Sequence, residues 1–252
     1  MASPFFRFKQ FTVWHDRCAM KVGTDGVLLG AWCPLSLSPK ESSPYRLLDI
    51  GTGSGLIALI LAQRLIHHSE LTIDAIDIDQ SAIEQAMYNF QQSPWSSTLH
   101  AHHSTLQNWQ GDEYDLIVSN PPYFQDSLKN PDAQRAAARH TDTLSYSELI
   151  AHAARLLKNT GTLALVLPFE AKEEIITLAS NHHLYPTHIT HVHSKLGKPA
   201  KRMLIAFTQL PSPTQPYTTL HHPTPHYTTL YIESVNQPRS EEYQTLTQDF
   251  YL

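Results

Sequence analysis

Four consecutive residues, Asn120-Pro121-Pro122-Tyr123, carry groups suited to chemistry on a conjugated amine. The nitrogen of an aromatic amine is a poor nucleophile because its lone pair is delocalised into the ring. Two acceptors, the Asn120 side-chain oxygen and the Pro121 carbonyl, would pull on both N–H bonds and push the nitrogen toward a nucleophilic, tetrahedral geometry. The two prolines stiffen the loop, and Tyr123 offers a ring on which a flipped base can stack. The alternative is a rigid surface turn without chemistry.

A glycine-rich stretch, DIGTGSG at residues 49–55, predicts a nucleotide-like ligand. Gly51, Gly53 and Gly55 lie between a predicted strand and a predicted helix, where the backbone must bend sharply and let a ligand come close. Dehydrogenases use a related loop for dinucleotides. This loop follows Asp49 and has no third glycine in dinucleotide spacing, so it favours S-adenosylmethionine. The alternative is a tight turn that binds nothing.

Asp77 ends the next predicted strand, about two dozen residues after the loop, where it could accept hydrogen bonds from both ribose hydroxyls. Asp79 precedes Gln80 and is the better candidate for the helix N-cap. The cofactor-binding residues predicted from this half of the chain are Asp49, Gly51, Thr52, Gly53, Gly55, Asp77, Ile78 and Asn120.

These residues need a sheet to position them, and apolar runs alternate with helical patterns from Arg46 onward. Ser145 and Glu148 have the spacing of a capping box, and Gly161 lies just beyond that helix. The predicted strands are 46–51, 71–79, 99–104, 114–120, 161–168 and an antiparallel pair, 185–193 and 202–210; the predicted helices are 54–66, buried on one face, 80–90, 145–158 and 169–179. Near-continuous apolar strands alternating with helices predict a mostly parallel sheet, with ligands beyond the carboxyl ends of its strands.

Composition sets the outer limits. The 252 residues and 41% hydrophobic content suit one α/β domain with some extension, or at most two small domains. The methyl-transfer residues place that domain at 45–210, with an N-terminal extension at 1–44. A C-terminal extension at 211–252 is expected to pack on the same domain, with a strand at 228–233 and a helix at 241–250. A net charge of −5 disfavours a generally basic nucleic-acid coat but permits a local basic face.

Two further classes of protein are disfavoured. No apolar run has the length of a signal peptide or a membrane span, so a cytoplasmic protein is expected. The two cysteines, Cys18 and Cys33, fit neither a disulfide framework nor a metal knuckle. The histidine pairs are scattered and lack metal-ligand spacing, so no metal is predicted and they are interpreted as compositional bias or surface replacements.

With these residues in place, the chain resembles the class I methyltransferases through residues 49–55, Asp77 and residues 120–123. More closely, it resembles the bacterial tRNA(Val) adenine-N6 methyltransferase family through residues 8–32, 138–150, 197–207 and 246–252. That resemblance implies a Rossmann-like α/β fold with a mostly parallel seven-stranded sheet and helices on both faces. It also implies S-adenosyl-L-methionine as cofactor and, as substrate, the adenosine beside the anticodon in the anticodon loop of valine tRNA. A monomer is expected.

The resemblance also implies a second set of cofactor contacts, Lys21, Thr24 and Asp25, closing over the methionine end of the cofactor. The alternative is that Thr24 or Asp25 caps the helix that follows. Residues 99–104 lack the acidic residue that related enzymes place near the adenine ring, which leaves Ser104 or Thr105 for that position.

Two basic stretches are candidates for contact with RNA phosphates. One follows the tetrapeptide and contains Arg135, Arg139 and His140; the other is a loop with Lys198, Lys201 and Arg202. Both could instead be ordinary solvated charge.

Three other functions remain open at this point. They are glutamine-N5 methylation of a protein, guanine-N2 methylation of ribosomal RNA, and a non-catalytic RNA-binding module. The glutamine enzymes share the tetrapeptide but typically carry an N-terminal helical recognition domain, and only 44 residues precede the first strand here.

Overall fold

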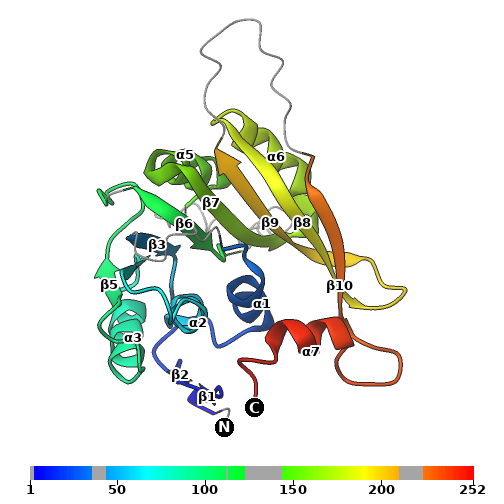
Figure 1. Ribbon diagram of the computed structural model, residues 1–252, viewed down its shortest axis with the longest axis horizontal. Helices are drawn as coiled ribbons and strands as arrows, with labels where there is room; N and C mark the ends of the chain where they lie inside the picture. Colours follow the sequence, from blue (N-terminus) through cyan, green and yellow to red (C-terminus); the bar gives the residue numbers. More distant parts are fainter. Residues whose placement is uncertain (1–2, 36–43, 112, 123–143, 210–223) are drawn as a thin grey trace, which may run out of the picture.

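The computed structural model describes residues 3–35, 44–111, 113–122, 144–209 and 224–252. Its strands are β1 (Phe5–Arg7), β2 (Thr12–Trp14), β3 (Tyr45–Ile50), β4 (Leu71–Asp77), β5 (Leu99–His103), β6 (Tyr114–Ser119), β7 (Leu157–Pro168), β8 (Leu184–Lys195), β9 (Ala200–Gln209) and β10 (His226–Glu233). Its helices are α1 (Thr24–Trp32), α2 (Leu56–Arg64), α3 (Gln80–Gln91), α5 (Tyr146–Leu156), α6 (Lys172–Ser180) and α7 (Glu241–Thr247), with a 3-10 turn η1 (Phe169–Ala171) (Figure 1).

Over the described residues, the main sheet has eight strands in the order β10-β8-β9-β7-β6-β3-β4-β5. β3 to β7 are parallel, β9 runs antiparallel to both β7 and β8, and β10 pairs parallel with β8. The predicted parallel α/β fold and the predicted antiparallel pair are confirmed. The expected count of seven strands was one too low, because the strand foreseen in the C-terminal extension hydrogen-bonds to the edge of the sheet.

The two faces of the sheet carry different helices, because strand side chains alternate between them. Leu47, Val118 and Ala164 join one hydrophobic cluster with α1, α2 and α3. Leu48 and Ile117, one residue away in their strands, join a second cluster with α5 and α6. The predicted helices on both faces are therefore present.

Two local expectations were wrong. Helix α2 is buried at every position from Leu56 to Gln63, because it packs against α1 as well as against the sheet, so it has no exposed stripe in that span. Gly161 does not follow the end of α5. That helix begins with the predicted Ser145–Glu148 capping box but runs directly into β7, where a Cβ on Gly161 would approach the Tyr114 carbonyl to 2.8 Å.

The two ends of the chain lie together below α1 and α2 (Figure 1). The Lys9 amide donates to the Phe250 carbonyl at 2.8 Å, and the Gln63 side chain donates to the Asp249 carbonyl at 2.9 Å. Phe8 and Tyr243 bury their rings in the same cluster as the sheet. The boundaries drawn at 44/45 and 210/211 stay a prediction. In the part of the chain that the structure describes, no helix is long and apolar enough to cross a membrane.

Candidate active site

The glycine turn after β3 forms an open floor at the carboxyl end of the sheet. Gly51 and Gly53 have φ values of 69° and 55°, and a Cβ on either would meet nothing within 4 Å. Gly55 serves a different purpose, because its φ is 81° and a Cβ there would lie 2.5 Å from the Phe90 ring. Two glycines therefore leave room for a ligand, and the third allows α2 to pack closely on α3.

Asp49 lies beneath this floor and lines neither of the cavities described below. Its carboxylate accepts hydrogen bonds from the Thr52 hydroxyl at 2.7 Å and the Ala58 amide at 3.3 Å. Complete burial raises the pKa of Asp49 to about 7. Asp49, which was predicted to contact the cofactor, therefore supports the glycine turn from below.

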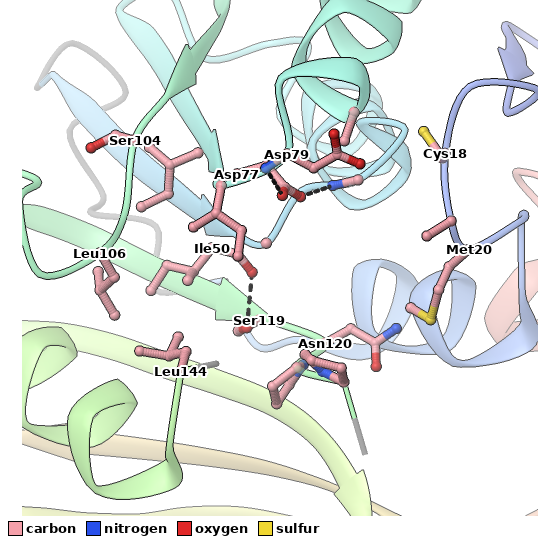
Figure 2. A pocket seen from close by; sticks show the side chains of 18 of the residues that line it. Cys18, Met20, Ile50, Asp77, Asp79, Ser104, Leu106, Ser119, Asn120 and Leu144 are labelled. Atoms are coloured by element: carbon pink, nitrogen blue, oxygen red, sulfur yellow. Dashed lines mark hydrogen bonds between the residues drawn. The ribbon is translucent and has the colours of Figure 1, made fainter. Parts of the chain in front are cut away.

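Asp77 links the second strand end to the floor. One carboxylate oxygen accepts from the Gly53 amide at 2.9 Å and the other from the Asp79 amide at 3.0 Å, as Figure 2 shows. Asp79 caps α3 by accepting from the Ser81 amide at 2.9 Å, so its predicted capping role is confirmed. Asp77 keeps further lone pairs for the hydroxyls of a ligand.

A first cavity of about 280 Å³ opens over β3 and β4. Of the predicted residues, Gly51, Gly53, Asp77, Ile78 and Ser104 line it. Its other walls, which sequence reasoning missed, come mostly from apolar side chains: Cys18, Ala19, Met20, Ile50, Ile76, Ala82, Leu106 and Leu144, with Asp79, Gln107 and Ser119 adding polar atoms. In Figure 2, Cys18 and Met20 lie across this cavity from Ser104 and Leu106.

The wall near Ser104 is fixed by the histidines of β5. The His103 Nε2–H donates to the Ile78 carbonyl at 2.9 Å, and the Ser104 amide donates to the Asp77 carbonyl at 3.1 Å. His102 lies 3.0 Å from the Asp74 carboxylate. Both rings of this histidine pair therefore make specific contacts.

A second cavity of about 260 Å³ shares part of the floor and lies between the glycine turn and the start of α1. Lys21, Thr24, Asp25 and Thr52 line it, as predicted for the second set of contacts and the loop. The alternative that Thr24 or Asp25 caps α1 was wrong, since the N-cap is Gly23 and no side chain caps the helix there. These side chains are therefore available to the cavity wall.

Arg202 also lines the second cavity, where its guanidinium forms an ion pair with Asp25. From the sequence, Arg202 was predicted to contact RNA together with its neighbours Lys198 and Lys201. Those two lysines are exposed, on and after a turn with Gly197 at φ 78°. The strand alternation that begins at Ala200 turns Arg202 away from them, toward α1.

The start of the tetrapeptide stands where the two cavities meet. The Ser119 hydroxyl donates to the Ile50 carbonyl at 2.9 Å and so ties the end of β6 to the end of β3. Asn120, Pro121 and Pro122 follow and line both cavities. Tyr123 lies outside the described residues, as do Arg135, Arg139 and His140 of the first basic stretch.

The N-terminal wall, residues 18–21, is held in place by buried polar side chains of α3. The Asn89 side chain accepts from the Trp14 amide and donates to two carbonyls, Trp14 and Ser54, at 2.8–3.0 Å. Gln85 accepts from the Arg17 amide at 3.2 Å. Both side chains are buried on the inner face of an amphipathic helix, which is the sequence signal that could have revealed this connection.

The donor set of the two cavities suits an elongated, polar-centred ligand. In the first cavity, Asp77 offers carboxylate oxygens beside the apolar side chains of Ile78 and Leu106. In the second cavity, charged side chains line the wall. The space above Gly51 and Gly53 joins the two. Among the described residues, no group of three or more His, Cys, Asp or Glu is placed to hold a metal ion.

Comparisons with known proteins agree with this arrangement. Residues 35–180 match the methyltransferase small domain family. The chain is 46% identical over 100% of its length to the tRNA1(Val) (adenine(37)-N6)-methyltransferase of Bacteroides thetaiotaomicron, and 47% identical over 100% to that of Parabacteroides distasonis, in each case covering 99% of the relative.

Among solved structures, a protein from Agrobacterium tumefaciens described as a predicted O-methyltransferase has the same fold. Its TM-score is 0.65 at 16% identity, with 90% of this chain and 96% of that chain covered. The predicted cofactor, S-adenosyl-L-methionine, is confirmed by the family and the fold, and the cavities described above fit it. The chain therefore belongs to the methyltransferase small domain family and to the family of the tRNA1(Val) (adenine(37)-N6)-methyltransferases.

Proposed function

We propose that this protein methylates the exocyclic N6 amine of adenosine 37, beside the anticodon of valine tRNA. The observation that carries the proposal is the position of Asn120 and Pro121, which line both cavities at the end of β6. The relatives named for this reaction match the whole chain and support the choice of substrate.

The chain's own residues account for the activation of the amine. S-adenosyl-L-methionine, when bound, supplies an electrophilic methyl group. The Asn120 side-chain oxygen and the Pro121 carbonyl accept hydrogen bonds from the two N–H groups of the amine, which localises the lone pair on nitrogen. The prolines hold these acceptors in place, and Tyr123 stacks on the flipped base. The amine sheds its proton to solvent after attack, so no general base is required.

The walls of the two cavities support a set of cofactor contacts. Asp77 would accept hydrogen bonds from the ribose, and Ile78 and Ser104 would lie beside the adenine ring. Lys21, Thr24 and Asp25 would close over the methionine end. Asp49 and Gly55 would support the loop from outside the cavities.

A loop substrate suits this site because an unpaired base is easier to extrude than a base in a duplex. Phosphates flanking the target are assigned to Arg135, Arg139 and His140, which follow the tetrapeptide in sequence. Lys198 and Lys201 are assigned to more distant phosphates. The ion pair with Asp25 favours a place for Arg202 at the methionine end of the cofactor.

The test is transfer of tritium from labelled S-adenosyl-L-methionine to total tRNA, ribosomal RNA, DNA and a release-factor-like protein, each offered separately. Nucleoside analysis should recover the label as N6-methyladenosine from tRNA, and an unmodified valine tRNA transcript should accept one methyl group. Label in protein alone would favour glutamine methylation, and N2-methylguanosine from ribosomal RNA would favour the guanine reaction. No transfer to any acceptor would favour a binding module.

A further inference from the structure

A row of partly exposed rings runs along the outer part of the sheet. Its members are Phe169 of η1, His191 and His193 of β8, and Tyr227 and Tyr231 of β10, here called the ring row. β10 pairs with β8 in parallel register, Thr229 with His191 and Tyr231 with His193, so the side chains of these two strands face the same way.

The rings contact one another across the strands. Phe169 meets His191 edge-on with 4.9 Å between ring centres, and His191 meets Tyr227 at 6.1 Å. His193 and Tyr231 lie 5.0 Å apart with their planes inclined by 37°. The ring row therefore offers several π surfaces at spacings that successive bases could reach.

These rings remain accessible because β10 is the last strand of the sheet. Tyr227 is 54% exposed, and the other four side chains of the ring row are half-buried. Burial, together with the charges of Lys172 and His193, lowers the pKa of His191. At neutral pH its ring is therefore uncharged and suited to stacking.

The ring row begins beside the candidate active site. Phe169 directly follows Pro168, which pairs in register with Arg202, and Arg202 lines the second cavity together with Asn120. Phe169 also packs against the same hydrophobic cluster as Leu144, which lines the first cavity. A strand of substrate leaving the reaction site on this side would meet the rings next.

Positive charge accompanies the rings. The Lys172 ammonium lies 5.4 Å from the centre of the Tyr227 ring. The His193 Nδ1–H donates to the Lys198 carbonyl at 2.6 Å and so ties the ring row to the turn that carries Lys195, Lys198 and Lys201. Acidic residues share this surface, since Glu233 is paired in register with Lys195, and Glu170, Glu173 and Glu174 flank Lys172. The excess of positive charge therefore lies at the turn, with Lys198 and Lys201. Rings beside lysines form a combination that binds single-stranded nucleic acid.

We propose that the ring row is the docking surface for unpaired nucleotides of the tRNA substrate outside the target base. Bases stack on His191, Tyr227 and Tyr231, while the lysines of the turn contact the phosphates. This inference rests on the proposed function, and it assigns the rings to substrate affinity and not to the methyl-transfer step.

The test compares Tyr227→Ala, His191→Ala and their double variant with the wild type. Each loss should raise the Kd and KM for valine tRNA about fivefold or more, the fold-change for one lost base–aromatic stack. The Kd for S-adenosyl-L-methionine should stay within about twofold, which also shows that the variants fold. Tyr227→Phe keeps the ring and should behave as wild type. Tyr88→Ala removes a tyrosine of similar exposure from α3, far along the sheet, and should leave tRNA affinity unchanged.

The outcomes separate the two proposals. If the wild type methylates tRNA and the double variant keeps its tRNA Kd, the ring row is not a docking surface for RNA, although the proposed function stands. If the variants impair transfer only to a protein acceptor, the surface serves a protein and the inference is wrong. If the wild type methylates no tRNA, the proposed function fails and this inference fails with it.

Discussion

The two sides of the active site are assembled in different ways. On the cofactor side, around the glycine turn, several polar contacts join residues close in sequence, such as Asp49 with Thr52 and Asp79 with Ser81, and Asp77 adds a longer link to Gly53. On the far side, Asp25 meets Arg202 from another part of the chain, and Asn89 holds Trp14 from 75 residues away. The first side is built by a local motif, whereas the second exists only once the sheet has formed.

Asn120 stands between the two sides, so its loss should have the largest effect. Asn120→Ala removes one acceptor from the reacting amine and should lower the rate of methyl transfer by about 100-fold or more. Its Kd for S-adenosyl-L-methionine should change by only a few fold. Single-turnover transfer to valine tRNA, with calorimetry for the cofactor, measures both. Near wild-type transfer would remove the tetrapeptide from the mechanism.

Asp77 tests the cofactor side alone. Asp77→Ala should weaken cofactor binding about 10- to 100-fold, because hydrogen bonds to a charged group contribute about 1.5–3 kcal/mol. The Kd for tRNA should stay the same. Asp79→Ala is the matched control: it removes the cap of α3 but leaves the Asp77 side chain, and it should cost stability more than cofactor affinity. Equal cofactor affinity in the two variants would contradict the assignment.

Arg202 tests the far side, where sequence and structure suggest different ligands. Arg202→Ala should raise the cofactor Kd about three- to tenfold, in line with an ion pair worth about 1 kcal/mol at a partly exposed site. Lys201→Ala, its exposed neighbour, should instead raise the KM for tRNA and flatten its salt dependence. A rise in the tRNA KM alone for Arg202→Ala would restore its original assignment to RNA.

Asp49 tests the floor of the glycine turn through the stability of the folded chain, without a readout on ligand binding. Its folded pKa is raised to about 7, so between about pH 4 and 7 the folded chain holds a proton that the unfolded chain has lost. Asp49 therefore lowers the free energy of unfolding as pH rises through that window, by up to about 1.4 kcal/mol per pH unit. Above about pH 7 its contribution no longer changes with pH.

Asp49→Asn cannot titrate, so its stability relative to wild type should improve steadily from pH 5 to pH 7. Urea unfolding of the cofactor-free protein at three pH values measures the difference. A constant difference between the two proteins would show that Asp49 titrates in its ordinary range.

Much of the fold and half of the site could be predicted from the sequence, because those features repeat at fixed spacing. Apolar strands, the capping box at Ser145 and the glycine turn each have a sequence pattern that fits within about a dozen residues. Asp77 and Asn120 were identifiable because each ends an apolar strand, and strand ends of a parallel sheet share one edge.

The rest depended on packing between distant segments. No sequence pattern near Arg202 indicates that its side chain points toward Asp25. Its basic neighbours therefore suggested that it contacts RNA. Leu106 and Leu144 belong to no motif in the sequence, yet they form a cavity wall. Gly161 resembled a helix terminator because no glycine or proline marks the point where α5 passes directly into β7.

The meeting of the chain ends has a practical consequence for engineering. Ser3 and Leu252 bracket segments that hydrogen-bond to each other through Lys9, Gln248 and Phe250, while Leu252 itself is exposed. A short linker could join the ends, and the chain could be reopened at the exposed turn around Gly197. Such a circular permutant would keep the N-terminal wall. It would also test whether folding requires that wall to be synthesised before the sheet. Deleting residues 248–252 would instead loosen both ends at once.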